Sequence, residues 1–261
     1  MVEGRVTRGT TGTNRLRRVD RWIAQLPVLR TAADPLVVDL GYGASATTSL
    51  ELFDRLAKVR PDVEVVGIEI EPARVKLAST SAKPGVSFRL GGFEVPLPGA
   101  RSATVIRALN VLRQYDEGEV LANWHRMVGR LQPGGVLVEG TCNEVGRVCS
   151  WVDVSLEGPQ SLTVSLRLAD LDEPSIVAER LPKVLIHRNI PGERVHAFLA
   201  DLDRHWQYNA ALSAFGPSQR WIAVAKALKA EGWPVLGTQH RWKLGELTVA
   251  WESVAPNGFR W

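Results

Sequence analysis

A glycine-containing turn follows the first apolar run of this sequence and has the residue types that a nucleotide site needs. The run ends in Val37-Val38-Asp39-Leu40-Gly41-Tyr42-Gly43. Glycines let the backbone approach a ligand where a Cβ would collide with it. Glu69 ends the second apolar run, and a carboxylate can accept hydrogen bonds from both hydroxyls of a ribose. Together these residues predict a nucleotide site at the carboxyl edge of a parallel sheet.

The glycine turn alone leaves the nucleotide open, because Gly41-x-Gly43-x-x-Ala46 also satisfies the dinucleotide fingerprint. A nicotinamide dehydrogenase is therefore one interpretation. Three features favour another: Asp39 lies two residues before Gly41, the segment Asn110-Val111-Leu112-Arg113-Gln114-Tyr115 follows the fourth apolar run, and Leu131-Gln132-Pro133-Gly134-Gly135 precedes the fifth.

With these features the sequence resembles the class I S-adenosylmethionine-dependent methyltransferase family, over about residues 35–142 and again 218–252. Asp39, Gly41 and Gly43 match its first motif, and Val66-Gly67-Ile68-Glu69 matches its second. Gln132-Pro133-Gly134-Gly135 resembles its turn before the fifth strand, and Glu231-Gly232-Trp233 resembles its common Ala-Gly-Phe segment. The resemblance implies methyl transfer with S-adenosyl-L-methionine as the cofactor. The cofactor-binding residues that it implies are Asp39, Gly41, Tyr42, Gly43, Glu69, Ile70, Gly92, Phe93 and Asn110.

The sequence departs from the family pattern at two places. The third glycine of the first motif is replaced around Ser45, and the usual Gly-Asp after the third strand is Gly91-Gly92-Phe93. A carboxylate for the adenine amino group is therefore missing. Phe93 could stack on the adenine, the backbone at Gly92 and Phe93 could bond it, or Phe93 could be a core residue.

Methyl transfer is an in-line displacement, so the protein mainly aligns the two reactants and needs a general base only for a protonated acceptor. Catalytic candidates after the fourth strand are Asn110, Arg113 and Tyr115. His125 is interpreted as a packing residue. The substrate-side candidates in the later part of the chain are His187, His196 and His205. The Asn-Pro-Pro-Tyr and Pro-Cys motifs of DNA methylation are absent, which disfavours both DNA chemistries.

Alternating strand and helix patterns must position these residues. Strands are expected at 35–40, 63–68, 86–90, 103–108 and 136–141. The fold class is α/β, with a Rossmann-like methyltransferase sheet that is mainly parallel, an antiparallel C-terminal strand and an inserted hairpin and helix subdomain. Helix starts are expected at Asn14 as an N-cap, at the capping-box pair Thr48 and Glu51, and at Asp116 with Glu119.

Three regions follow from these patterns. Residues 1–30 form a basic arm and helix, residues 31–142 and 217–261 form the cofactor-binding core, and residues 143–216 form an inserted substrate or cap region. Trp151 and Trp206 could belong to that cap or to its hydrophobic core.

Composition limits the possible function classes. The 261 residues are 45% apolar, which suffices for a full core, and the formal net charge is +4. No apolar run could span a bilayer, so a cytoplasmic protein is expected. Cys142 and Cys149 lack zinc-site spacing and are expected to be buried thiols, and no metal is predicted.

The predicted acceptor is a small or lipid-linked metabolite. RNA is the alternative acceptor, because phosphates could be contacted by Arg5, Arg8, Arg15, Arg17, Arg18 and Arg21, although these residues could equally form a solvated face. A scaffold relative without activity is a further alternative. The oligomeric state does not follow from the sequence.

Overall fold

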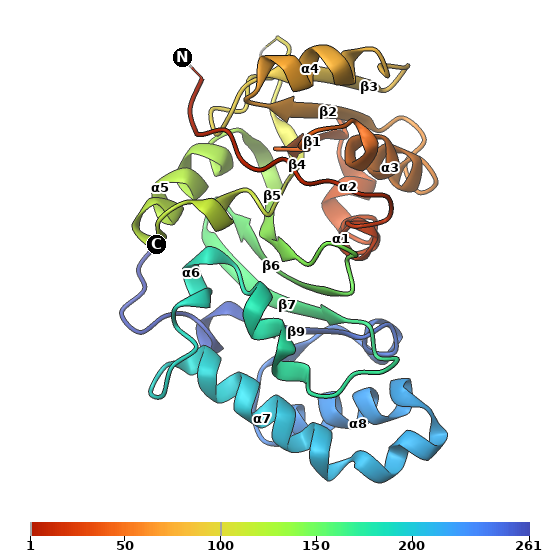
Figure 1. The fold of residues 1–261 in the computed structure, drawn as a ribbon, viewed down its shortest axis with the longest axis vertical. Coiled ribbons are helices and arrows are strands. Elements are labelled where there is room, and N and C mark those ends of the chain that lie inside the picture. Colours follow the sequence, from red (N-terminus) through yellow and green to blue (C-terminus); the bar gives the residue numbers. More distant parts are fainter. Residues whose placement is uncertain (1, 100) are drawn as a thin grey trace.

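The computed structural model describes residues 2–99 and 101–261. Within these residues nine strands form one sheet, in the order β3-β2-β1-β4-β5-β6-β7-β9-β8 (Figure 1). The first five strands in this order are joined by four parallel pairings, and every later pairing is antiparallel. The predicted α/β class is therefore confirmed.

The parallel half of the sheet carries the predicted strands. Its members are β1 (Leu36–Leu40), β2 (Glu64–Glu69), β3 (Val86–Leu90), β4 (Ala103–Leu109) and β5 (Leu131–Cys142). In β1 and β4 every residue is buried, as expected for apolar strands that are covered on both faces. Parallel pairing brings the carboxyl ends of these strands to one edge of the sheet.

The antiparallel half continues the same sheet. Its strands are β6 (Val148–Ser155), β7 (Gly158–Leu166), β8 (Val235–Leu236) and β9 (Glu246–Ala250). The predicted hairpin is the pair β6 and β7, and β6 lies directly against β5 with Cys149 opposite Cys142. Both cysteines are free and buried, as predicted. The connection from β5 to β6 is too short for a crossover, so β6 must run antiparallel.

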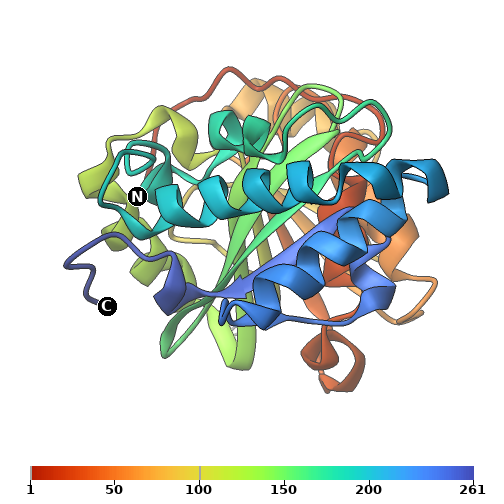
Figure 2. The same ribbon diagram turned by 90° about the horizontal axis from the view of Figure 1, so that it is seen from below.

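Helices cover both faces of the sheet (Figure 2). On one face lie α1 (Arg17–Ile23), α2 (Pro27–Thr31), α3 (Thr47–Leu56) and α4 (Pro72–Ser79), and on the other lie α5 (Glu117–Val128), α6 (Lys183–Ile186), α7 (Arg194–Tyr208) and α8 (Pro217–Ala230). Short elements complete the chain: α9 (Gln239–Trp242) and the 3₁₀ helices η1 (Leu112–Gln114), η2 (Pro174–Arg180), η3 (Ala210–Phe215) and η4 (Trp251–Ser253). No helix in the described part of the chain is long and apolar enough to cross a membrane.

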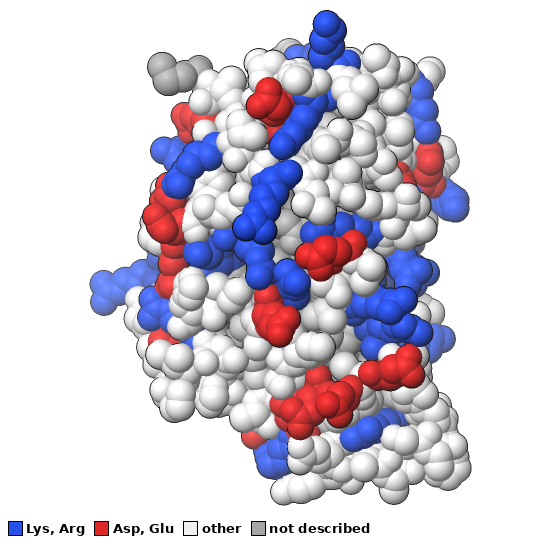
Figure 3. Space-filling view, in the orientation of Figure 1, with Lys and Arg blue, Asp and Glu red and all other residues white. Residues whose placement is uncertain are grey.

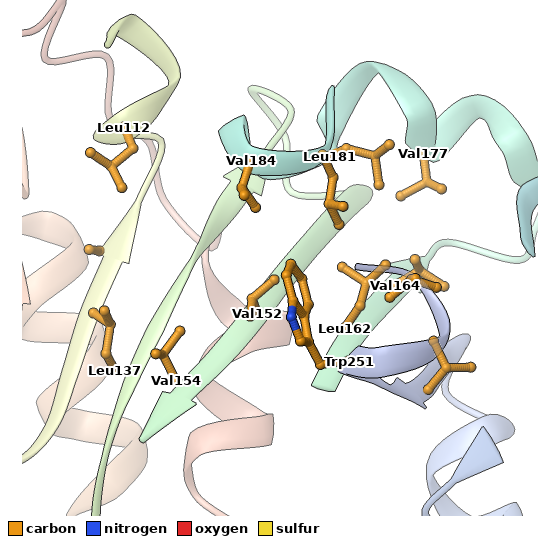
Figure 4. Packing of buried hydrophobic residues seen from close by; sticks show 14 of the residues in the cluster. Leu112, Leu137, Val152, Val154, Leu162, Val164, Val177, Leu181, Val184 and Trp251 are labelled. Carbon is orange, nitrogen blue, oxygen red and sulfur yellow. The ribbon is translucent and has the colours of Figure 1, made fainter. Parts of the chain in front are cut away.

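Alternating side chains of the strands form two separate core layers. Val37 and Val105 pack in the layer of α1 and α3, whereas Val38 and Ile106 pack in the layer of α5. Over the antiparallel half, the segment of η2 and α6 closes the second layer. Figure 4 shows its apolar side chains above those of the strands, with Val177, Leu181 and Val184 facing Val152, Leu162 and Val164. Burial of each such side chain stabilises the fold by roughly 1.5–3 kcal/mol.

The predicted helix starts had mixed outcomes. Asp116 and Glu119 form the expected capping box at the start of α5. The other two predictions were wrong. Asn14 has φ +60° and lies before α1, whose N-cap is Leu16. Thr48 lies inside α3, where its hydroxyl donates to the Asp39 carboxylate and so is unavailable as a cap.

Glu139 in the middle of β5 is fully buried, and neither of its carboxylate oxygens has a hydrogen-bond partner among the described residues. Burial raises the pKa of Glu139 to about 8, an effect that the Trp124 indole offsets only in part. Because an unpaired buried charge is costly, the folded protein binds a proton here that the unfolded chain has already released near neutral pH.

The Glu139 contribution to stability is therefore complete below the ordinary carboxyl pKa and is lost as the pH rises to about 8. For one proton the expected slope is about 1.4 kcal/mol per pH unit. Urea unfolding should show that the free energy of unfolding differs less between pH 5.5 and pH 8.5 in Glu139→Gln than in the wild type. Glu252→Gln, at an exposed position, is the control. Equal pH dependence in all three proteins would contradict the assignment.

Candidate functional site

The turn after β1 brings the backbone of two strands together. Gly41 and Gly43 have φ values of +68° and +89°, which favour glycine. A Cβ on Gly41 would lie 2.6 Å from Cγ2 of Val111, so glycine there allows the segment after β4 to approach the turn. The Gly41 N–H donates to the carbonyl of Ile68 at 2.7 Å, which ties the turn to β2.

The Asp39 carboxylate lies below this turn and bonds only to protein groups. It accepts hydrogen bonds from the hydroxyls of Thr48 at 2.9 Å and Ser49 at 2.8 Å, and from Nε of Arg107 at 3.0 Å. Asp39 is buried. It therefore links the end of β1 to the first turn of α3 and to β4.

Arg107 belongs to a buried charge network that the sequence analysis did not find. Its guanidinium bonds to Asp39 and to Asp20 of α1, and Arg55 of α3 bonds to Asp20 at 2.5 Å. Arg107, Asp20 and Asp39 are all buried. Burial raises the pKa of Asp20, and the two arginines oppose this rise. The only sequence signal was an arginine inside an otherwise apolar strand, 103–109.

Glu69 lies where the nucleotide hypothesis needs a carboxylate. Its Oε2 accepts from the backbone N–H of Gly43 at 3.0 Å, and its Oε1 accepts from the N–H of Ile70 at 3.0 Å and of Glu71 at 3.3 Å. Nη1 of Arg74 lies 3.5 Å from Oε1. The predicted residues of β2 and of the glycine turn are thus in direct contact.

The end of β3 presents the backbone of Gly92 and Phe93 and the carboxylate of Glu94, which accepts from the N–H of Glu3 at 2.8 Å. The Phe93 ring is buried and packs edge-on against Tyr115, with 5.2 Å between centroids. Its backbone N–H donates to the carbonyl of Glu3 at 2.9 Å. The Gly92 N–H donates to Glu94 at 3.0 Å. Ring packing against Tyr115 agrees with the interpretation of Phe93 as a core residue.

An N-terminal arm, defined as residues 2–12, lies across the carboxyl ends of the parallel strands. Figure 1 shows it in red, crossing in front of the sheet. From one end to the other, the Glu3 carbonyl accepts from Phe93, the Thr7 carbonyl accepts from Arg74 at 3.0 Å, and the Gly9 carbonyl accepts from the N–H of Ala44 at 2.9 Å. The arm thereby connects the segment after β3, the helix α4 and the turn after β1.

Two neighbouring hollows lie along this edge of the sheet. The smaller one lies between the arm and the strand ends and has a volume of about 20 Å³, enough for about one water. The larger one has a volume of about 490 Å³. Thr7, Gly41 and Val111 line both hollows. The two spaces therefore adjoin at the turn after β1.

Most of the predicted site residues line these spaces, whereas Asp39, Tyr42 and Gly43 line neither. The smaller hollow is lined by Gly41, Glu69, Ile70, Gly92, Phe93 and Tyr115, and the larger one by Gly41, Asn110 and Arg113. Tyr42 lies elsewhere, because its ring packs against Phe88 with 5.3 Å between centroids. Its buried hydroxyl lacks a partner among the described residues, and burial raises the pKa of Tyr42. None of the candidate histidines lines either hollow in the described chain.

Asn110 is held rigidly at the edge of the larger hollow. Its φ is +64°, and its backbone N–H donates to the carbonyl of Gly140 at 2.7 Å. Its side-chain amide donates to Sγ of Cys142 at 3.3 Å and accepts from the Cys142 N–H at 2.9 Å. A strained residue with every side-chain group fixed is common at functional sites.

Three of the six N-terminal arginines have protein partners among the described residues. Arg5 pairs with Glu119 of α5, and the buried Arg15 donates to backbone carbonyls that include that of Asn143 at 3.2 Å. Arg18 donates to the carbonyl of Leu244 at 3.1 Å. These three side chains point to three different regions, so they do not form a common phosphate-binding face.

The region expected to be an inserted cap contributes to the site at two points. Glu144, in the turn between β5 and β6, and Arg180, at the end of η2, both line the larger hollow. Trp151 and Trp206 are buried away from it: Trp151 packs against Trp22, and Trp206 against Trp221. The interpretation of both tryptophans as core residues is the one that agrees with the structure.

The sequence matches no known protein-family model and no curated protein at a significant level. Solved structures do resemble the chain. Human N-acetylserotonin methyltransferase in complex with S-adenosylmethionine is 23% identical, with a TM-score of 0.37, over 48% of this chain and 33% of that one. DesVI of Streptomyces venezuelae is 17% identical over 59% and 72%, with a TM-score of 0.38. The N-methyltransferase NodS of Bradyrhizobium japonicum is 19% identical over 49% and 68%, with a TM-score of 0.35. The matched part thus spans about a third of the human enzyme.

Proposed function

We propose that this chain is an S-adenosyl-L-methionine-dependent methyltransferase that acts on a small or lipid-linked metabolite. The observation that carries the proposal is the contact of Glu69, at the end of β2, with the glycine turn after β1. In this arrangement a carboxylate for a ribose, an open turn for the methionine part and the Phe93 backbone for the adenine follow one another along one edge.

The groove that the N-terminal arm occupies is lined by residues that would accommodate the cofactor. A Cβ on Gly92 would lie 1.8 Å from the Glu3 carbonyl oxygen, and one on Gly43 would lie 2.7 Å from that of Gly9. Both glycines therefore leave room for a narrow, extended occupant. The hollow beneath the arm is too small for a nucleotide, so the cofactor and the arm exclude each other under this proposal.

Under this proposal, different residues would bind the cofactor and align it with the acceptor. Bound S-adenosyl-L-methionine would supply an electrophilic methyl group. Glu69 would orient the ribose, the backbone at Gly41 would border the methionine part, and Asn110 would stand between cofactor and acceptor. Alignment of this kind can account for much of the acceleration of a displacement reaction.

Three of the six arginines that could contact RNA, Arg5, Arg15 and Arg18, are already engaged by protein groups, which supports a metabolite over RNA as the acceptor. An extended nucleic acid would need several free cations on one surface. The larger hollow is concave, and its volume of about 490 Å³ is in the range of small-molecule sites.

Glu69→Gln tests the proposed cofactor site. The variant keeps the size of the side chain but loses the charge that strengthens hydrogen bonds to a diol. We expect S-adenosylhomocysteine to bind roughly tenfold to a hundredfold more weakly, as measured by isothermal titration calorimetry in a chain lacking residues 2–9. Glu71→Gln in the same turn, outside both hollows, is the matched control.

The proposal fails if S-adenosylhomocysteine neither binds nor raises the unfolding temperature of the arm-deleted chain. Stabilisation by NAD instead would favour the dehydrogenase interpretation. Unchanged affinity in Glu69→Gln would leave the cofactor but overturn the assigned site.

A further inference from the structure

The larger hollow gathers positive charge with little to balance it. In the described chain it is lined by four arginines, Arg8, Arg15, Arg113 and Arg180, and by one carboxylate, Glu144. Figure 3 shows basic side chains, with a few acidic ones among them, across the middle of the face over which the arm runs.

The single carboxylate is weakly placed to neutralise these cations. Glu144 is exposed, and Nη2 of Arg180 lies 3.7 Å from its Oε2. Its pKa is lowered, first by a hydrogen bond to its own backbone and then by Arg180, Arg15 and Arg113. Burial lowers the pKa of Arg113, and repulsion from Arg180 and Arg8 lowers it further. A ligand anion would relieve this repulsion.

Two of the four arginines, Arg113 and Arg180, have guanidinium groups suited to hold such an anion. Arg113 uses Nη1 for the carbonyl of Glu179 at 2.9 Å, which fixes its direction. No carboxylate among the described residues lies within ion-pair distance of Arg113. Arg15 differs, since its donors are directed to backbone carbonyls. Arg8 belongs to the arm and would move with it.

We propose, on the basis of the methyltransferase function proposed above, that the acceptor is anionic and that Arg113 and Arg180 bind its carboxylate or phosphate group in the larger hollow. Guanidinium groups bind both anions through paired hydrogen bonds. The hollow meets the cofactor groove at Gly41 and Val111. An acceptor anchored by its anion at the arginines therefore extends toward the methyl donor past Asn110.

The experiment measures anion binding directly, without cofactor and without turnover. Phenyl phosphate and benzoate are the probes, titrated by calorimetry into the full chain. We expect Arg113→Gln and Arg180→Gln each to weaken the binding of at least one probe roughly tenfold or more, because each removes charge-assisted hydrogen bonds. Arg147→Gln, an exposed position in the adjacent turn outside the hollow, should change it little. Arg113→Lys should restore part of the affinity.

The relative affinity of the two probes distinguishes phosphate from carboxylate. Binding of neither probe, or equal losses in Arg147→Gln, overturns the inference. Tighter binding of a single-stranded RNA decamer with the same arginine dependence also overturns it. Titration of S-adenosylhomocysteine into the same variants keeps the two proposals apart: normal cofactor binding without anion binding defeats only this inference, whereas anion binding without cofactor binding defeats the methyltransferase function.

Discussion

Deletion of residues 2–9 is expected to raise the affinity for S-adenosylhomocysteine roughly tenfold or more, because the arm must leave the groove before the cofactor can enter. The deletion removes the hydrogen bonds of Glu3 and Gly9 to the segments after β3 and β1, and that of Thr7 to Arg74 of α4. It retains Thr10, whose carbonyl accepts from Arg15, so the start of α1 keeps its contacts. Calorimetric titration of both chains is the measurement.

A pair of glycines within the arm gives a finer test. Gly9 has φ +68°, and a Cβ there would lie 2.5 Å from Cζ of Arg74. Gly9→Ala should therefore loosen the arm, through the strain of an alanine at this φ and the displacement of the Arg74 guanidinium, and raise the cofactor affinity. Gly12→Ala is the matched control, since its Cβ would come only within 3.9 Å of the Glu144 carbonyl oxygen. If deletion and Gly9→Ala both weaken binding, the arm is part of the cofactor site and the proposed exclusion is wrong.

Arg107→Met should lower the free energy of unfolding by about 3–5 kcal/mol, because Asp20 and Asp39 would lose a buried cation. For a chain of this size the unfolding temperature should fall by roughly 10 °C. Asp20 would keep Arg55, and Asp39 would keep two hydroxyl donors. Thermal and urea unfolding at neutral pH measure the effect.

Arg101→Met is the comparison with Arg107→Met, because Arg101 also makes two ion pairs but is partly exposed. Arg101 contacts Asp34 at 2.5 Å and Glu64 at 2.9 Å, and 29% of its side chain is exposed. Pairs at the surface contribute about 0–1 kcal/mol. Similar losses in both variants would show that the burial of the Arg107 network does not determine its effect. In Asp20→Asn the Arg107→Met change should cost less, because one uncompensated charge is gone.

The sequence predicted the parallel half of the fold well, because β1, β2 and β4 are short, largely apolar runs that are almost wholly buried. Parallel topology then places the ends of β1, β2, β3 and β4 at one edge. The contact between Glu69 and Gly43 follows from this topology alone. The roles of these residues toward the cofactor remain predictions.

Other features depended on long-range contacts that no local pattern reveals. The arm has an extended, glycine-containing sequence, but its path over the groove depends on acceptors and donors far along the chain, such as Phe93 and Ala44. In the sequence, Arg107 lies within an apolar run and Asp20 among the arginines of a basic segment, and neither position indicates a partner. Their pairing required α1 to pack beside α3. Similarly, the Thr48 hydroxyl donates a hydrogen bond to Asp39 and does not cap a helix.

The covalent connection of the arm to the groove that it fills has a consequence for concentration. A segment tethered through a few residues is presented to its site at a fixed effective concentration, on the order of millimolar for a short flexible connection. Dilution of the protein cannot release it, and a free peptide of the same sequence would compete poorly. Under the proposed function, the level of cofactor at which the groove opens is thus an intrinsic property of one chain, independent of how much protein is present.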